Sequence, residues 1–102
     1  MDTHEIVAVT RFEHVGPHCL RLEFDDGAVQ TIDFSPILFG QLFGPLRDLD
    51  FFNQVSLDPD FHTLVWPNGA DFDPSDLRHW PEALPFFLKA AERWKQQASP
   101  VH

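Results

Sequence analysis

The sequence predicts an α+β domain: a small antiparallel sheet of about five strands, several short helices and a C-terminal amphipathic helix. Three patterns lead to this prediction. Apolar and polar residues alternate on both sides of an Asp-Gly dipeptide, which is typical of a β-hairpin. Segments with Ser-Pro or Asp-Pro then mark helix starts, and the end of the chain repeats apolar residues at helical spacing. A chain of 102 residues has room for one core of this kind.

The first three strands surround the predicted hairpin. Glu5 to Phe12 holds mostly apolar residues with little helix-favouring content, and Gly16-Pro17 ends this strand. From His18 to Phe24 apolar and polar residues alternate with period two, and Asp26-Gly27 tolerates the positive φ angles of a tight turn. Val29 to Phe34 is the return strand.

A two-residue turn at Asp26-Gly27 would determine the pairing of the hairpin. It would place Phe24 opposite Val29, and Leu22 opposite Thr31. Replacing Gly27 by valine should then damage folding, because a β-branched residue resists a positive φ.

Two short helices are expected next. Ser35 is expected to cap a helical turn that runs through Phe39, with Gly40 and Gly44 ending it. Asp48 is expected to cap a second helix that contains two phenylalanines.

Two short strands, Val55 to Leu57 and His62 to Trp66, complete the predicted sheet. Pro67 to Asp71 is too rich in turn-forming residues for a helix or strand, so an ordered loop is expected there. Asp73 then caps a helix whose first position is Pro74.

Pro81 is expected to end that helix, and a terminal amphipathic helix is expected beyond Pro85. We therefore divide the chain into an α+β domain at residues 1–80 and a C-terminal helical extension at residues 81–102. The extension is expected to pack on the same domain or on a second subunit, because its apolar residues need a surface. These residues are Phe87, Ala91, Trp94 and Ala98.

The charge is strongly acidic, with seven Lys and Arg against sixteen Asp and Glu, a formal net charge of −9. Such a chain repels phosphate backbones, so no direct nucleic-acid binding is expected. Only Lys89, Arg93 and Lys95 form a short basic stripe. The charge fits solubility alone or complementarity to a basic protein partner.

The single cysteine, Cys19, cannot form an intramolecular disulfide, and we interpret it as a small buried apolar residue. We find no leader and no apolar run of about 18 residues, which predicts a cytoplasmic protein without a membrane span. His14 and His18 flank a turn, but their spacing matches no established zinc pattern. The chain also lacks phosphate-binding and nucleophile motifs, so no cofactor, metal or catalytic residue is predicted.

The most informative segment runs from Trp66 to Pro74. As a recognition loop it would use Trp66 as an anchor and Asp71 as a hydrogen-bond acceptor, with Asn68 beside them. As structure, Trp66 would pack in the core and Asn68 would form the turn. Trp94 in the terminal helix completes the candidate binding set.

Four segments of the chain resemble the bacterial domain-of-unknown-function family 2442. The resemblance covers about residues 5–80, and its most specific part is Trp-Pro-Asn-Gly-Ala-Asp at residues 66–71. The segments are Leu22 to Gly27, Asp33 to Pro36, Pro45 to Asp48 and Val65 to Asp71. The resemblance implies a small α+β fold like the N-terminal domain of a Nitrosomonas protein that typifies it, and no established enzyme activity.

Members of that family occur alone, fused to a helix-turn-helix domain, or encoded beside a small toxin-like protein, which implies an antitoxin-like or adaptor role for some. Residues 81–102 are too few and too weakly basic for a helix-turn-helix. The sequence therefore favours a small acidic protein-interaction module that binds a basic protein or forms a homodimer. The alternative is a small hydrolase or metal-dependent enzyme that uses His and Asp residues near the Trp66 to Asp73 loop.

Overall fold

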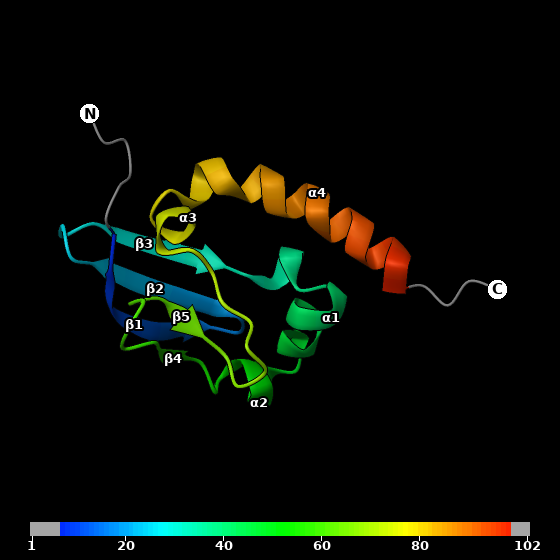
Figure 1. Ribbon diagram of the computed structural model, residues 1–102, viewed down its shortest axis with the longest axis horizontal. Helices are drawn as coiled ribbons and strands as arrows, with labels where there is room; N and C mark the ends of the chain where they lie inside the picture. The colour runs from blue at the N-terminus through cyan, green and yellow to red at the C-terminus, as the bar shows by residue number, and fades with distance from the viewer. Residues whose placement is uncertain (1–6, 99–102) are drawn as a thin grey trace.

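The computed structural model describes residues 7–98 and confirms the α+β class. Figure 1 shows α4 running along one side of the molecule, from α3 beside the sheet to the short helices around α1. The strands are β1 (Val9–Gly16), β2 (Cys19–Phe24), β3 (Val29–Asp33), β4 (Ser56–Leu57) and β5 (Leu64–Val65). The helices are η1 (Ser35–Ile37), α1 (Gly40–Phe43), η2 (Gly44–Arg47), α2 (Leu49–Phe52), α3 (Pro74–Arg78) and α4 (Trp80–Ala98).

The five described strands form two antiparallel sheets, whereas a single sheet was expected. One sheet has the order β1-β2-β3, and the other joins the two-residue strands β4 and β5. β1 begins at Val9, later than the expected start at Glu5, which lies outside the described residues. The amide of Val9 donates to the carbonyl of His62 (2.9 Å), which links the two sheets at this point.

The β2–β3 hairpin is present, but its predicted register was wrong by one residue. Leu22 lies opposite Gln30, and Glu23 lies opposite Val29. The amide of Phe24 donates to the Ala28 carbonyl (2.9 Å), so the connection has three residues, and two were expected. Gly27 ends this connection with a φ of 87°, the left-handed conformation of a three-residue hairpin loop.

The two faces of the three-stranded sheet differ in chemistry. The inner face is apolar and buried, with Leu20, Leu22, Phe24 and Ile32. The outer face has a ladder of ion pairs in which Arg21 contacts Glu13 (3.2 Å) and Glu23 (3.3 Å), and Arg11 lies 3.9 Å from Glu23. These contacts follow from the register, because Arg11 pairs with Glu23 and Glu13 with Arg21.

The short helices between β3 and β4 differ in how they begin: η1, α1 and η2 have no side-chain cap, whereas α2 has one. Asp48 caps α2 as expected, accepting from the Asp50 amide (3.1 Å). Ser35 was expected to cap the preceding turn, but η1 begins without a side-chain cap, and Asp33 accepts from the amide (3.0 Å) and hydroxyl (2.8 Å) of Ser35. Gly40 was expected to end a helix, and in the structure it begins α1.

Helix α3 begins as predicted, with Asp73 accepting from the Ser75 amide (2.9 Å) and Pro74 in the first turn. The prediction for α4 was wrong at its start, because the helix begins at Trp80 and includes both Pro81 and Pro85. Proline in a first turn costs little, since that amide has no intrahelical acceptor.

Pro85 lies inside α4, where proline costs about 3 kcal/mol. The helix persists because it buries Trp80, Phe87 and Ala91 in the core. Burial of one large apolar side chain contributes about 1.5–3 kcal/mol, so the packing outweighs the break.

The core lies between the inner sheet face, the short helices and α4, and its centre is aromatic. Phe34 is fully buried, and its ring contacts Phe52, Phe72, Trp66 and Trp80 at centroid distances of 5.2–6.3 Å. Aromatic pairs at these separations add to burial through ring electrostatics. The segments that follow β3 and β5 therefore pack together with α2 and α4 in one aromatic cluster.

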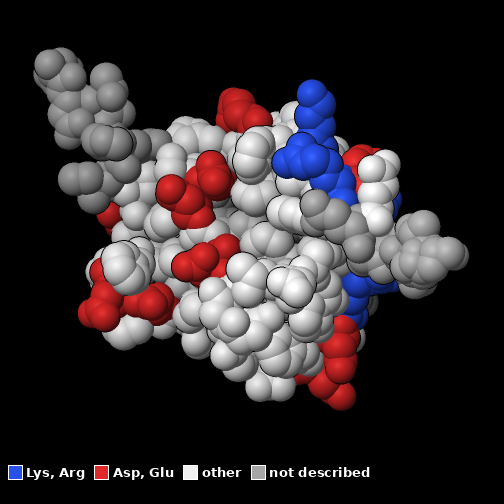
Figure 2. Space-filling view, turned by 45° about the vertical axis from the view of Figure 1, so that its right-hand side comes forward, with Lys and Arg blue, Asp and Glu red and all other residues white. Residues whose placement is uncertain are grey.

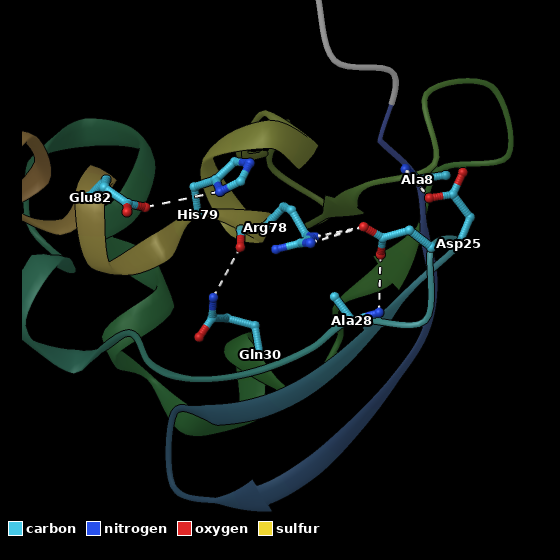
Figure 3. Close-up of polar contacts among 8 residues, drawn as sticks. Ala8, Asp25, Ala28, Gln30, Arg78, His79 and Glu82 are labelled. Atoms are coloured by element: carbon cyan, nitrogen blue, oxygen red, sulfur yellow. Dashed lines mark hydrogen bonds and ion pairs between the residues drawn. The ribbon is translucent and has the colours of Figure 1, made fainter.

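A polar contact joins the β2–β3 turn to the end of α3. Figure 3 shows Arg78 directed toward this turn, where its guanidinium donates twice to one oxygen of Asp26 (2.9 and 3.1 Å). The other Asp26 oxygen accepts from the Ala28 amide (3.0 Å), and Gln30 donates to the Arg78 carbonyl (3.0 Å). The Ala28 amide and then Arg78 lower the pKa of Asp26, so its carboxylate is ionised at neutral pH.

Candidate protein-interaction surface

The loop after β5 is held by hydrogen bonds at several points. The Gly69 amide donates to the Trp66 carbonyl, and the Trp66 amide donates to the Ala70 carbonyl, both at 2.9 Å. Asn68 accepts from the Ala70 amide (3.1 Å) and donates to the Leu42 carbonyl (2.9 Å), which ties the loop to α1. Asn68 therefore positions the loop, and its side chain already has partners within the chain.

Trp66 lies in the core. Its side chain is 2% exposed, and its indole nitrogen donates to the Phe52 carbonyl (2.9 Å). Its ring packs against Phe34, Phe52 and Phe72. A tryptophan this buried has no surface for contact with a partner protein, so its role is to anchor the loop to the core.

Asp71 lies on the surface of the same loop. Its backbone forms an isolated β-bridge with Val65, which turns the side chain outward and leaves it exposed. Asp71 lines a shallow depression of about 330 Å³ together with Phe61, Thr63 and Asp73. The floor is apolar, because Phe72 and Pro74 also line it.

Phe61 is the residue at this depression that the sequence analysis missed. It is 73% exposed, although it is a large apolar side chain. Asp58 holds the turn that presents it, with one carboxylate oxygen accepting from the amides of Asp60 (2.7 Å) and Phe61 (3.0 Å). The available signal was the Asp58-Pro59-Asp60 turn sequence, which predicts a turn here but not the exposure of the residue that follows it.

Several carboxylates lie at or near this depression. Asp71 and Asp73 line it directly, and Asp58 and Asp60 belong to the turn that presents Phe61. One carboxylate oxygen of Asp73 accepts the hydrogen bond that caps α3. Burial and then the charge of Asp73 raise the pKa of Asp76 at the start of α3.

The basic residues of the sheet and α3 do not neutralise this acidic region, because each of them contacts a carboxylate that lies outside it. Arg11 and Arg21 contact Glu13 and Glu23, and Arg78 contacts Asp26. The other four basic residues lie on or beside α4. Figure 2 shows Lys and Arg side chains in the right half of the view, whereas Asp and Glu are spread over both halves. These four residues are Arg47, Lys89, Arg93 and Lys95.

Trp94 occupies a separate place on α4. It is half-buried, and its ring packs against Phe43 (5.6 Å between centroids) and over Gly40. A Cβ added at Gly40 would lie 3.0 Å from the Trp94 ring, so a larger residue there would displace the indole. Trp94 does not line the depression that contains Asp71, and the structure thus separates the four sequence-predicted site residues.

The histidine and cysteine candidates have structural contacts. His18 donates from Nε2 to the Arg47 carbonyl (3.0 Å) and packs on Phe52, while His14 packs on Phe12. Cys19 is half-buried, and burial, followed by the nearby Asp33, raises the pKa of its thiol. Within residues 7–98, no three His, Cys, Asp or Glu side chains are placed to hold a metal ion together.

Comparison with known proteins identifies one family. The model of the family described as "Protein of unknown function (DUF2442)" matches residues 9–83, which covers more than half of the chain. Searches of curated proteins and of solved structures gave no match to this chain. In the described part of the chain, no helix is both long enough and apolar enough to cross a membrane.

Proposed function

The chain belongs to the DUF2442 family, and from this premise we propose that it is a small protein-interaction module that binds a basic protein partner. The partner docks at the acidic depression beside Phe61, with Asp71 on its rim. In its finer form the proposal describes a cytoplasmic adaptor or an antitoxin-like protein, whose partner is a small basic protein.

The exposure of Phe61 is the observation that supports this proposal most directly. A phenylalanine that is 73% exposed costs free energy in water unless another surface covers it. Its surroundings favour a cationic cover, because Asp58, Asp60 and Asp71 are close by. An aromatic anchor with charged residues around it is a common arrangement at protein interfaces.

The charge distribution supports a basic partner at this site in particular. Arg11, Arg21 and Arg78 are paired with carboxylates elsewhere, so they do not neutralise the carboxylates of the depression. Electrostatic complementarity would speed the association and make it sensitive to salt. The same negative charge disfavours nucleic acid at this surface.

The test is affinity purification of the tagged chain from its native cells at low and moderate salt, with mass spectrometry and light scattering of the eluted species. A stoichiometric basic partner that is lost as the salt concentration rises is the expected result. Isolation of the chain alone at every salt concentration would contradict the proposal.

Two variants place the interaction on the surface. Phe61→Ser and Asp71→Lys should each remove the partner from the eluate, because one loses the apolar anchor and the other reverses a rim charge. Val29→Ser is the matched control, since Val29 is 50% exposed on the outer sheet face away from the depression. Equal partner recovery with Phe61→Ser and wild type would exclude this surface.

A further inference from the structure

A second surface, on α4, differs in chemistry from the acidic depression. A groove of about 590 Å³ lies between α4 and η1, and it is lined by Pro36, Pro85, Phe86, Leu88, Lys89 and Lys95, with Ala91 and Glu92. Phe86 is 67% exposed and Leu88 is 41% exposed. The described chain thus has a second apolar surface that its own core does not cover.

The groove is the basic part of an acidic protein. Lys89, Arg93 and Lys95 lie within seven consecutive residues of α4, and Lys89 and Lys95 line the groove itself. Glu92 is the carboxylate in its lining, and it lies 3.8 Å from Lys95. Arg47 extends the positive region, because Arg47 and Lys95 both lie about 5 Å from the centre of the Phe39 ring.

Most of the groove lies beyond the part of the chain that the family model matches. The family match ends at residue 83, and the α4 residues that line the groove begin at Pro85. Pro36 lies inside the matched region and forms the opposite wall. The groove therefore depends on the C-terminal part of α4, which lies outside the matched region.

We propose that this groove binds an acidic amphipathic helix of a partner protein. Pro85 and Lys95 are ten positions apart on α4, about 15 Å along the helix axis, or roughly three turns of a docked helix. A helix in a groove buries apolar residues at positions i, i+3 or i+4, and i+7. Its carboxylates would meet Lys89 and Lys95, while its apolar face covers Phe86 and Leu88.

Charge argues against a second copy of the chain as the occupant. Pairing α4 with α4 would bring Lys89, Arg93 and Lys95 close to the same residues of the other copy. Each copy also has a net charge of −9, which opposes association at low salt. A distinct acidic helix avoids the first cost, because its carboxylates would face Lys89 and Lys95, and its site is separate from the Phe61 depression.

The experiment uses a fluorescent synthetic peptide of about 15 residues, with leucines on one helical face and glutamates on the other. Fluorescence anisotropy should show saturable binding to the full chain that weakens as salt is added. Phe86→Ser and Lys89→Glu should each weaken binding about tenfold, because one removes an apolar anchor and the other reverses a facing charge. Both residues are exposed, so the variants should fold.

Phe61→Ser is the control that separates this inference from the proposed function, and it should leave peptide binding unchanged. Absence of saturable binding would overturn the inference, as would equally tight binding of a peptide with lysines in place of the glutamates. Light scattering that shows a dimer of the chain, dissociated by Phe86→Ser, would also overturn it, since a second copy would then occupy the groove.

Discussion

The loop from Trp66 to Phe72 and the outer side of α4 both contain large aromatic side chains but differ in the exposure of those side chains. In the loop the aromatic side chains are buried, with Trp66 2% and Phe72 3% exposed, whereas Phe86 on α4 is 67% exposed. Within the same loop Asn68 donates to the Leu42 carbonyl and so positions the backbone, whereas Asp71 is exposed. A dense aromatic and polar motif can therefore serve mainly internal packing, while large exposed apolar side chains lie in less conspicuous sequence.

Trp66→Ala should give the largest effect and is the direct test of the inward role of the loop. It removes a fully packed indole and one of the hydrogen bonds to the Phe52 carbonyl, which keeps the Val55 amide as a donor (3.2 Å). We expect a loss of about 3–5 kcal/mol in the free energy of unfolding, measured by urea denaturation. A loss near that of an exposed substitution would mean that Trp66 is a surface residue after all.

Gly27→Val tests the turn of the β2–β3 hairpin. Gly27 has a φ of 87° with open space around it, so backbone strain and not a clash limits the substitution. We expect about 1–3 kcal/mol of destabilisation. Gly27→Asn, which tolerates the left-handed region, should lose much less. Equal thermal midpoints for the two variants would contradict the assigned turn.

Asp73→Ala tests the N-cap of α3, at the point where the loop after β5 ends. The variant removes the acceptor of the Ser75 amide and should cost about 1 kcal/mol. Asp73→Ser keeps a capping oxygen and should recover most of this stability. If chemical denaturation shows no difference between alanine and serine, the carboxylate of Asp73 does not act as the α3 cap.

Asp26→Asn should have the smallest effect, and one that depends on pH. The pKa of Asp26 is lowered in the folded protein by the Ala28 amide and then by Arg78. A lowered carboxyl pKa stabilises the fold above the unfolded pKa, and this contribution is lost as pH falls through the folded pKa. The urea midpoint of the wild type should therefore be slightly higher than that of Asp26→Asn at neutral pH, and this difference should disappear in acid. A gap that is constant with pH would show that charge at Asp26 is not involved.

The sequence predicted best the features that depend on neighbouring residues. The caps at Asp48 and Asp73 were correct, because each needs only an amide two residues ahead. The hairpin register was wrong because a two-residue and a three-residue connection both suit Asp-Gly, and only the Phe24 to Ala28 bond distinguishes them. The start of α4 was missed because packing of Trp80 and Phe87, distant in sequence from their contacts, outweighs the two prolines.

The candidate site was predicted less well for the same reason. Trp66, Asn68 and Asp71 lie close together in the sequence, which suggested one site. Their exposure, however, depends on the tertiary packing around the loop. Phe61 and Phe86 could not be told from core phenylalanines by residue type, since the chain has eleven of them. Which phenylalanines remain exposed is decided only when the core around Phe34 is complete.

The aromatic core also gives the protein its own optical probes. The chain has three tryptophans and no tyrosine, so its intrinsic emission comes from Trp66, Trp80 and Trp94. Trp66 and Trp80 are buried around Phe34, and they report the state of the core. Trp94 packs over Gly40 and reports whether α4 is seated against α1. Excitation of the unlabelled chain can therefore follow core formation and helix docking as separate events, once single tryptophans are replaced by phenylalanine.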